Sequence, residues 1–543
     1  MIMLKKIAAF LLATLLFCGL MAGCGQGKTT YTSIWYSVDD EGDTNSTTRN
    51  RTKGEGQTAT TAPVGSGVTR PTRKQNEMIT FKKVEDKGAD YNVKGTVRIA
   101  VDTVRPTDYE PMFDIMEQLY PNVTVEYDYW THSSNDDGRE YLIKKMKTGT
   151  AADIIWDEAG EMPRYIKEGW VYPITKFVAK DPEAANIPAS VKKDYTFFGE
   201  LYAVPHQATI EIVAINKTLQ DMLGLKKPAL NWTMEDYEKF LRAGATGFTS
   251  GKCVGIYRLF EAYHRYSYYT SNSSAKNTNY GVDGYNYNTK QFEYQWLKLG
   301  TDKFRYWRTM LPGVEAYWEA TASKAGDGTS ALQHNLGISN YLSTWSAGKS
   351  LVHDCITWQL KEYDNYNFDW YAWPMPNIDG KMPVHIDQCF ITSTCADENI
   401  NAAFQLLRFM TYTTNGNLAR LSMYDDAQKG KYALNSYVYY PVTTNKTVIQ
   451  KFKDLKCTGE AEVYILESIP RSPRYDNYKL VPEWRSILHD YIGSPANDVT
   501  DGLKDGSSMQ EPVAKANKKM AEAWKDFETE TKKVQAAFNA THK

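Results

Sequence analysis

Polar and aromatic side chains stand at the ends of two stretches of sequence that have the character of β-strands. Asp102 ends the first stretch, and Trp156, Asp157 and Glu158 end or follow the second. Because open α/β sheets bind ligands at the carboxyl ends of their strands, we expect these four residues beside a binding crevice. Carboxylates accept hydrogen bonds from hydroxyl groups, and an indole ring offers a flat apolar face for stacking. The combination suits a ligand with a polar edge and an apolar face.

The segments that would position these residues alternate between strands and helices. Gly95–Asp102, Val123–Tyr127 and Ala152–Trp156 each have the pattern of a strand. Between them, Tyr109–Tyr120 carries apolar residues at helical spacing, and Tyr141–Thr148 forms a second predicted helix. Strands that alternate with helices predict βαβ units, and therefore an α/β fold with a mostly parallel sheet.

The composition is that of an ordinary globular protein of several domains. The chain has 543 residues, of which 42% are hydrophobic and 24% charged. Lys and Arg total 63 against 65 Asp and Glu, and no stripe of basic residues stands out, so we expect no nucleic-acid partner. Aromatic residues make up 13% of the chain, more than a core alone suggests.

The sequence carries no motif for metal ligation, cofactor binding or a disulfide framework. It contains no Cys-x-x-Cys pair and no His-Glu-x-x-His, and His206, His353 and His385 are scattered. Of the seven cysteines, Cys18 and Cys24 lie at the N-terminus, which leaves an odd, scattered set. We expect Cys389 and Cys395 to be small buried apolar residues, and we expect no metal and no cofactor.

The first 24 residues have the pattern of an export signal. A short basic region with Lys5 and Lys6 precedes an apolar run too short to span a bilayer. The segment Leu20–Cys24 resembles the lipobox of bacterial lipoproteins, which implies lipidation at Cys24 and attachment to the outer face of the cell membrane. A plain secretory signal with an incidental cysteine is the alternative. Residues 25–94 are rich in Thr, Ser, Gly and charge, and we expect them to form a disordered tether.

An ordered series of motifs resembles one known family. These motifs are Lys147–Trp156, Tyr165–Ile174, Leu201–Pro205 followed by Ile215–Lys217, Trp232–Thr233, Trp345–Lys349 and Asn401–Met410. In this order and spacing they resemble the family 1 extracellular solute-binding proteins of the maltodextrin and multiple-sugar type. The resemblance covers about residues 95–538. It implies two α/β lobes joined by hinge strands, a periplasmic-binding-protein-like fold of type II, with a ligand cleft between the lobes and delivery of the solute to an ABC importer permease.

The resemblance also implies further residues that contact the ligand. Trp156, Asp157 and Glu158 match the aromatic-plus-acid loop of the first lobe. The second lobe would add an acid, a stacking tyrosine and a stacking tryptophan, and the segments that return to the first lobe would add polar side chains; these residues are Glu261, Tyr263, Trp358, Gln207, Thr209, Asp387 and Gln388. Each has a simpler alternative, since Trp358 could belong to the core and the polar residues could face water.

The family pattern divides the chain into discontinuous lobes. We expect lobe 1 to comprise residues 95–207 and 380–440, and lobe 2 to comprise 208–379 and 441–543 with its C-terminal helices. The predicted protein is a monomeric receptor for a carbohydrate, with an oligosaccharide as the favoured solute, and not an enzyme. The main alternative is a secreted carbohydrate-active enzyme, although the sequence offers no acid pair in a recognisable catalytic context. An adhesive wall protein would predict internal repeats, and we find none.

Overall fold

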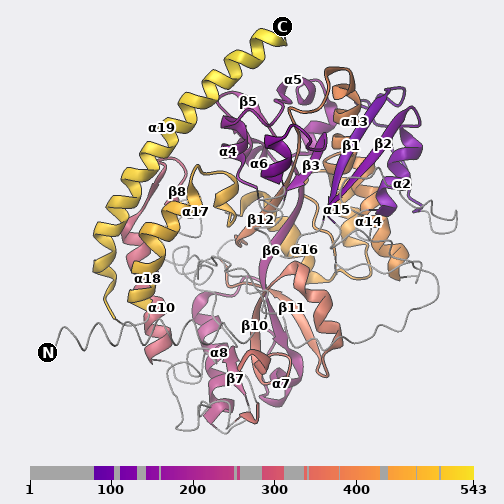
Figure 1. Ribbon diagram of the computed structural model, residues 1–543. Coiled ribbons are helices and arrows are strands. Elements are labelled where there is room, and N and C mark those ends of the chain that lie inside the picture. Colours follow the sequence, from indigo (N-terminus) through magenta and orange to yellow (C-terminus); the bar gives the residue numbers. More distant parts are fainter. Residues whose placement is uncertain are drawn as a thin grey trace, which may run out of the picture. The chain divides into compact units, whose positions relative to one another are not determined.

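The computed structural model of the protein describes residues 79–102, 110–130, 142–157, 160–249, 253–256, 284–310, 336–338, 341–377, 380–428, 438–472, 474–500 and 503–542 (Figure 1). All of these residues belong to one of the two compact units of the chain, Arg51–Lys543.

Eight strands of the described residues form one mixed sheet. They are β1 (Gly95–Asp102), β2 (Val123–Trp130), β3 (Ile154–Asp157), β6 (Val204–Asn216), β7 (Val254–Ile256), β10 (Ser350–Ile356), β11 (Trp370–Pro374) and β12 (Val384–Ile391). Their order is β2-β1-β3-β12-β6-β10-β7, and β11 also pairs with β6. Two short hairpins lie outside this sheet: β4 (Thr196–Phe197) with β5 (Glu200–Leu201), and β8 (Tyr285–Asn286) with β9 (Gln291–Phe292).

The alternation predicted from the sequence is confirmed for the first elements. β1 has the predicted bounds, α2 (Glu110–Leu119) falls within the predicted helix, and β2 and β3 overlap the other two predicted strands. β1 lies parallel to β2 and β3, as βαβ units require. The expectation of a mostly parallel sheet is wrong, however, because β12 runs antiparallel to both β3 and β6. In addition, β6 runs antiparallel to β10 and β11.

β6 belongs to two groups of strands. Its residues from Val204 to Ile210 pair with β12, whereas those from Glu211 to Asn216 pair with β10 and β11. Pro205 stands near the start of this strand, where a missing N–H is tolerated, and β-branched residues make up most of the stretch Thr209–Ile215. We call the group of β1, β2, β3 and β12 the first lobe and the group of β7, β10 and β11 the second lobe. In Figure 1, β6 runs from one group to the other.

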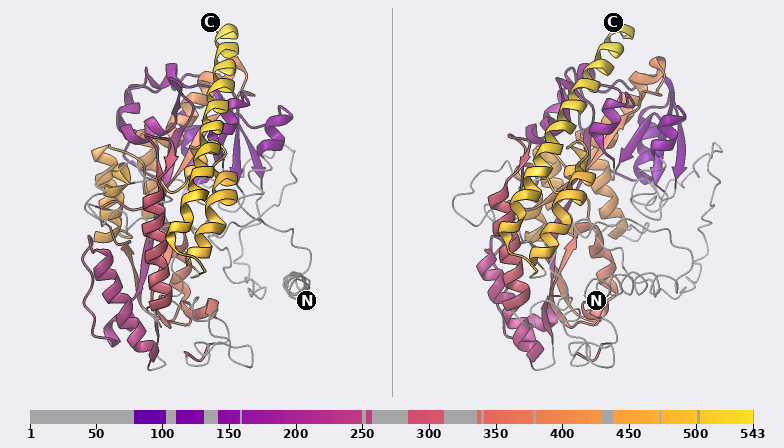
Figure 2. Two further views of the ribbon diagram at one scale, coloured as in Figure 1. Left: turned by 90° about the vertical axis from the view of Figure 1, so that its left-hand side faces the viewer. Right: turned by 60° about the vertical axis from the view of Figure 1, so that its left-hand side comes forward.

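Helices cover both groups of strands. They include α4 (Met162–Lys167), α5 (Thr175–Val178), α6 (Ala189–Asp194), α7 (Lys217–Met222), α8 (Met234–Thr249), α10 (Tyr294–Met310), α13 (Ile400–Thr411), α14 (Thr414–Gln428), α15 (Lys446–Lys453), α16 (Glu460–Ser468), α17 (Trp484–Ile487), α18 (Ser494–Thr500) and α19 (Gln510–Thr541). Figures 1 and 2 show α19 as one long helix on the same side as α17.

The core of the first lobe is built on α13. All of its residues except Asn401 are buried, and the helix packs against β1, β6, β12, α2 and α14. Its polar residues Asn401, Gln405 and Arg408 recur at helical spacing on one face, and the apolar residues of the other faces form the core.

Parts of the C-terminal region pack against the first lobe. α15 contacts α14, and α19 contacts α4, although both helices fall in the range 441–543 that the sequence assigned to lobe 2. The predicted lobe boundaries at 207/208 and 440/441 stay a prediction. In the structure, β6 changes its pairing partners between Ile210 and Glu211.

The chain is ordered before the predicted start of the body. Ile79 and Val93 are buried, so the stretch 79–94 packs against the protein instead of continuing the disordered tether that was expected to reach residue 94. Residues 25–78 and the predicted signal 1–24 lie outside the described residues. No helix within the described ranges is long and apolar enough to span a bilayer.

Candidate functional site

Two predicted site residues meet where β6 and β12 run side by side. Gln207 and Asp387 are register partners, and Nε2 of Gln207 donates to Oδ2 of Asp387 over 2.8 Å. Asp387 is 8% exposed and Gln207 is half-buried, so the pair lies just below the surface. Side chains on alternate residues of a strand share a face, which places Thr209 and its partner His385 on the same face. Three residues predicted to contact the ligand, Gln207, Thr209 and Asp387, therefore lie on one face of these two strands, and their contact with a ligand stays a prediction.

Lys479 holds the other oxygen of Asp387. Its Nζ donates to Oδ1 of Asp387 over 3.0 Å and to the carbonyl of Ile386 over 3.2 Å, and it lies 3.2 Å from Oδ2 of Asp476. Burial alone would lower the pKa of Lys479, but Asp387 and Asp476 together raise it well above its ordinary value. The lysine is therefore a buried, charged donor that fixes the orientation of the Asp387 carboxylate.

Arg474 extends this network deeper into the first lobe. It donates to both oxygens of Asp476, over 2.6 and 2.9 Å, and Asp476 in turn accepts a bond from the backbone N–H of Ile386. The buried charges are thus paired and hydrogen-bonded, as charges inside a protein must be. The segment 474–479 is thus joined to β12 by hydrogen bonds and ion pairs.

Arg420 contributes a second cation beside Gln207. Its Nη2 donates to Oε1 of Gln207 over 2.8 Å, and its Nη1 lies 2.9 Å from Nε2 of His206. Since a guanidinium can only donate, Nε2 of His206 must accept and the ring is neutral. Burial, and then the charge of Arg420, lower the pKa of His206 well below 6.5. The ring of Tyr439 covers the guanidinium at 3.9 Å from its centroid.

Trp156 packs against this polar group from β3. Its ring centroid lies 4.3 Å from that of His206 and 5.5 Å from that of Phe113, and the side chain is only partly buried. The indole therefore has apolar support behind it and an accessible part, the arrangement that a stacking surface needs.

Gln388 lies next to the end of β3, opposite Asp157 in the register of β12 and β3. It is fully buried, and its Nε2 donates to the carbonyl of Gly160 over 3.4 Å. Within the described part of the chain, its Oε1 has no hydrogen-bond partner. Leaving a buried acceptor unsatisfied is costly, so this oxygen is available to a donor from a ligand or a water molecule.

Trp358 comes from the second lobe. It is the second residue of a 3-10 helix, Thr357–Asn365, that follows β10, and it is half-buried. The hydroxyl of Thr357 accepts a bond from the backbone N–H of Ile210 over 3.2 Å, which places the start of this helix at the point where β6 changes lobes. Glu211, the next residue of β6, is fully buried and lies 2.7 Å from Nε2 of His385.

The structure therefore brings together part of the predicted set. Trp156, Gln207, Thr209, Asp387 and Gln388 come from neighbouring strands of the first lobe, and Trp358 comes from the lobe that β6 enters. Asp102 and Asp157 end β1 and β3, and only their backbones are described. Glu158, Glu261, Tyr263 and Cys24 lie outside the described residues, and so do the contacts predicted for them.

The residues that the sequence interpretation missed are the buried cations. Lys479, Arg474 and Arg420 lie far along the chain from the strands that they contact, and no local pattern distinguishes them from surface residues. The cysteine prediction is confirmed, since Cys389 and Cys395 are free and buried. Among the described residues, no group of three or more His, Cys, Asp or Glu side chains could hold a metal ion.

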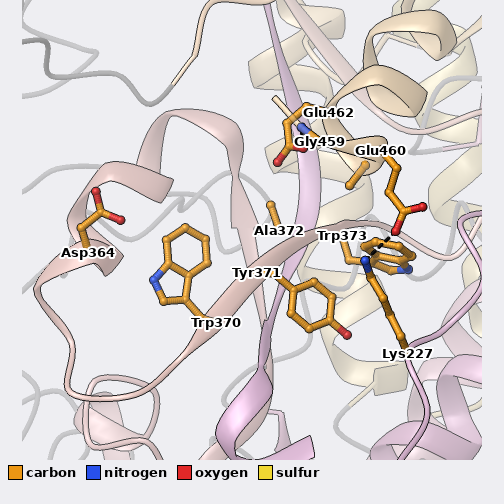
Figure 3. Close-up of a pocket in the computed structure, with 10 residues that line it drawn as sticks. Lys227, Asp364, Trp370, Tyr371, Ala372, Trp373, Gly459, Glu460 and Glu462 are labelled. Carbon is orange, nitrogen blue, oxygen red and sulfur yellow. Dashed lines mark hydrogen bonds and ion pairs between the residues drawn. The ribbon is translucent and has the colours of Figure 1, made fainter. Parts of the chain in front are cut away.

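A cavity of about 320 Å³ lies apart from these residues, between β11 and the start of α16 (Figure 3). Trp370, Tyr371 and Trp373 of β11 line it. Nζ of Lys227 lies over the ring of Trp373, 4.2 Å from its centroid, and pairs with Glu460 at 2.5 Å. Lys227 therefore covers the rings of Trp373 and Tyr371, and its charge is balanced within the cavity.

Comparison with known proteins identifies the family and the fold. Residues 112–425 match the family described as bacterial extracellular solute-binding protein. Three similar solved structures are an ABC substrate-binding protein from Listeria monocytogenes in complex with cycloalternan, a sugar transporter from Rhizobium etli in an open conformation, and the GacH receptor of Streptomyces glaucescens, solved unliganded and with acarbose.

These likenesses extend over most of each chain. The TM-scores are 0.56, 0.56 and 0.55, with 16%, 15% and 13% identity, and the matches cover 79%, 78% and 79% of this chain and 99% of each of the others. No curated protein matches the sequence. At this identity the likeness establishes the fold, which is the two-lobed periplasmic-binding-protein fold.

Proposed function

This chain belongs to the family of bacterial extracellular solute-binding proteins, and we propose that it is the receptor of an ABC importer for a carbohydrate, with an oligosaccharide as the favoured solute. The solute would bind in the cleft between the lobes and then be delivered to the permease subunits. Several proteins of the same fold are described as complexes with sugars, including cycloalternan and maltotetraose.

The observation that carries this proposal is the arrangement around the crossing of β6. Trp156 lies on the first lobe, and Trp358 is the second residue of the 3-10 helix whose first residue, Thr357, contacts Ile210 of β6. Polar groups on β6 and β12 include Gln207, Asp387 and the buried Oε1 of Gln388. Aromatic faces that stack on sugar rings, combined with fixed acceptors and donors for hydroxyl groups, provide the recognition that a carbohydrate needs.

The receptor would work outside the cell, held to the membrane by lipid on Cys24. The family is extracellular, and the lipobox-like segment before Cys24 supports the anchor. A diacylated cysteine that also carries an N-acyl chain would supply more than the single chain that gives only reversible membrane binding. We infer that the protein acts as a monomer and catalyses no reaction.

Isothermal calorimetry against a panel of oligosaccharides, with chromatography of the same samples, tests this proposal. We expect heat of binding for at least one glycan and recovery of that glycan unchanged. Appearance of shorter products would support the alternative of a carbohydrate-active enzyme. Absence of binding across sugars, with binding of another polar solute, would contradict the carbohydrate assignment and leave the family membership intact.

A further inference from the structure

The stretch 79–94, which precedes β1, is bound to the first lobe by a buried ion-pair cluster. Arg408 of α13 donates to both oxygens of Asp86, over 2.8 and 2.7 Å, and to both oxygens of Asp181, over 2.6 and 2.8 Å. The side chains of Arg408, Asp86 and Asp181 are 0%, 5% and 2% exposed. A guanidinium that serves two carboxylates in its two-pronged geometry makes the strongest kind of side-chain hydrogen bond.

Two amide side chains hold the backbone of the same stretch. Asn415 of α14 accepts from the N–H of Val84 and donates to the carbonyl of Val84, both over 2.9 Å. Gln405 of α13 accepts from the N–H of Asp90 over 3.1 Å and donates to the carbonyl of Gly88 over 3.2 Å. Each amide replaces the partner that a neighbouring strand would otherwise supply.

Gly88 lets the chain come this close to the cluster. A Cβ added there would lie 2.2 Å from Oδ1 of Asp181 and 2.5 Å from Nη2 of Arg408. Its N–H also donates to Oδ1 of Asp86 over 3.1 Å. The absence of a side chain at position 88 is therefore a condition for the ion pairs and the backbone bonds to form together.

We propose that residues 79–94 form a strap that fixes the N-terminal extension of the chain to α13 and α14 of the first lobe. The first lobe is then the lobe held by whatever anchors the N-terminus, and the second lobe is the part that moves when the cleft closes. The proposed movement of the second lobe depends on the receptor function proposed above, whereas the binding of the strap to the first lobe does not. The strap is a positioning element, since none of the hydrogen bonds and ion pairs given above for it, all among described residues, involves a predicted ligand residue.

Hydrogen–deuterium exchange on the full chain tests the strap without any ligand. We compare the wild type with Asp86→Ala, which removes the strap carboxylate but leaves Arg408 paired with Asp181. The matched control is Asp90→Ala, because the Asp90 carboxylate is exposed and accepts a bond from Asn92 in a local turn. In the wild type we expect the amide hydrogens of Val84 and Asp90 to be protected from exchange. In the control Asp90→Ala, the amide of Val84 should keep this protection. In Asp86→Ala, both amides should exchange at least tenfold faster than in the wild type.

Two results would overturn the strap. One is exchange of the wild-type amides at the rate of an unfolded peptide, and the other is equal protection in Asp86→Ala and Asp90→Ala. Peptides from β12 report whether the body stays folded. If Asp86→Ala unfolds the body, then Gly88→Ala decides instead, because it keeps every charge and only prevents the close approach; unchanged protection in that variant also contradicts the proposal.

Spin labels then test which lobe the strap follows. Labels at Lys87 and Lys147 report the strap against the first lobe, and labels at Lys87 and Lys361 report it against the second, in a Cys457→Ser background. All three lysines are exposed. With maltotetraose as the probe, we expect the first distance to stay constant and the second to change. A change in the first distance would refute the assignment to the first lobe. If calorimetry detects no binding of the probe, the proposed solute is in doubt, whereas the exchange experiment still decides the strap.

Discussion

Nε2 of Gln207 donates to Oδ2 of Asp387 over 2.8 Å, and this bond ties β6 to β12 close to the point where β6 leaves the first lobe. Both residues were predicted to contact ligand. In the structure they are each other's partners; in addition, Lys479 donates to the other oxygen of Asp387, and Arg420 donates to the amide oxygen of Gln207. A solute that reaches them meets groups already fixed in direction, so little side-chain entropy is lost on binding.

Replacing Lys479 with Met should destabilise the fold strongly. The change removes the cation from a site where Asp387 and Asp476 are buried, and breaking a buried pair typically costs about 3–5 kcal/mol. Urea unfolding followed by fluorescence measures the loss. The matched control is Lys504→Met, because Lys504 pairs with Asp498 at the exposed surface, where a pair contributes about 0–1 kcal/mol. Equal losses in the two variants would contradict this view of Lys479.

Stability should fall as the pH drops below about 6.5, in part because of His206. Burial and then Arg420 hold its pKa well below 6.5 in the folded protein, whereas the unfolded chain binds a proton near that pH. Unfolding therefore takes up a proton in acid, and the contribution of His206 is complete above pH 6.5 and is lost as the pH falls toward its folded pKa. One such proton changes the free energy of unfolding by up to about 1.4 kcal/mol per pH unit.

The variant His206→Gln isolates the contribution of His206 to the pH dependence of the free energy of unfolding. Glutamine keeps an acceptor for Arg420 but does not titrate, so the loss of stability between about pH 7 and pH 5 should be smaller than in the wild type. His489→Gln is the matched control for the same substitution at an exposed histidine. Identical slopes in His206→Gln and the wild type would show that His206 is protonated in the folded state as readily as in the unfolded state.

Alanine at Trp156 or Trp358 should weaken binding of a cognate glycan by about ten- to a hundredfold, which corresponds to about 1–3 kcal/mol of lost burial and stacking. Trp156 also supports Phe113 and His206, so its replacement should cost some stability as well. Trp484→Ala serves as the contrast, because Trp484 is fully buried and a core tryptophan costs about 3–5 kcal/mol on truncation. Calorimetry measures the loss of affinity and thermal unfolding measures the loss of stability in the same samples. Together they distinguish a ligand-contacting tryptophan from a core tryptophan. Intact affinity with a large loss of stability at Trp156 or Trp358 would assign that tryptophan to the core.

Local patterns predicted the strands and helices of the first lobe well. β1, α2, β2 and β3 follow from short-range periodicity, which the sequence displays directly. The antiparallel placement of β12 and the role of the buried cations could not be found this way, because they depend on pairing between distant segments. Asp86 and Arg408 are 322 residues apart, and Asp86 sits in a polar stretch whose composition indicates disorder. The ion pair with Arg408 and the amide contacts of Gln405 and Asn415 order the stretch despite that composition.

Serine at Cys24 should release the protein into the culture medium. The substitution removes the thiol that would carry the lipid and leaves the apolar export segment unchanged. Fractionation of cells that produce the wild type and Cys24→Ser, followed by immunoblotting, measures the distribution. Cys18→Ser is the control, since that residue lies within the predicted signal and should not alter attachment. Retention of Cys24→Ser in the membrane fraction would contradict lipidation at this position.

Small-angle X-ray scattering with and without a saturating glycan tests the central claim most directly, because a solute held between two lobes must draw them together. Calorimetry first fixes the concentration at which the glycan saturates the protein. We expect a smaller radius of gyration with the glycan. The same glycan concentration should give a smaller decrease in Trp358→Ala, because weaker binding leaves that variant only partly occupied. An unchanged radius of gyration at proven saturation of the wild type would contradict binding in the cleft between the lobes.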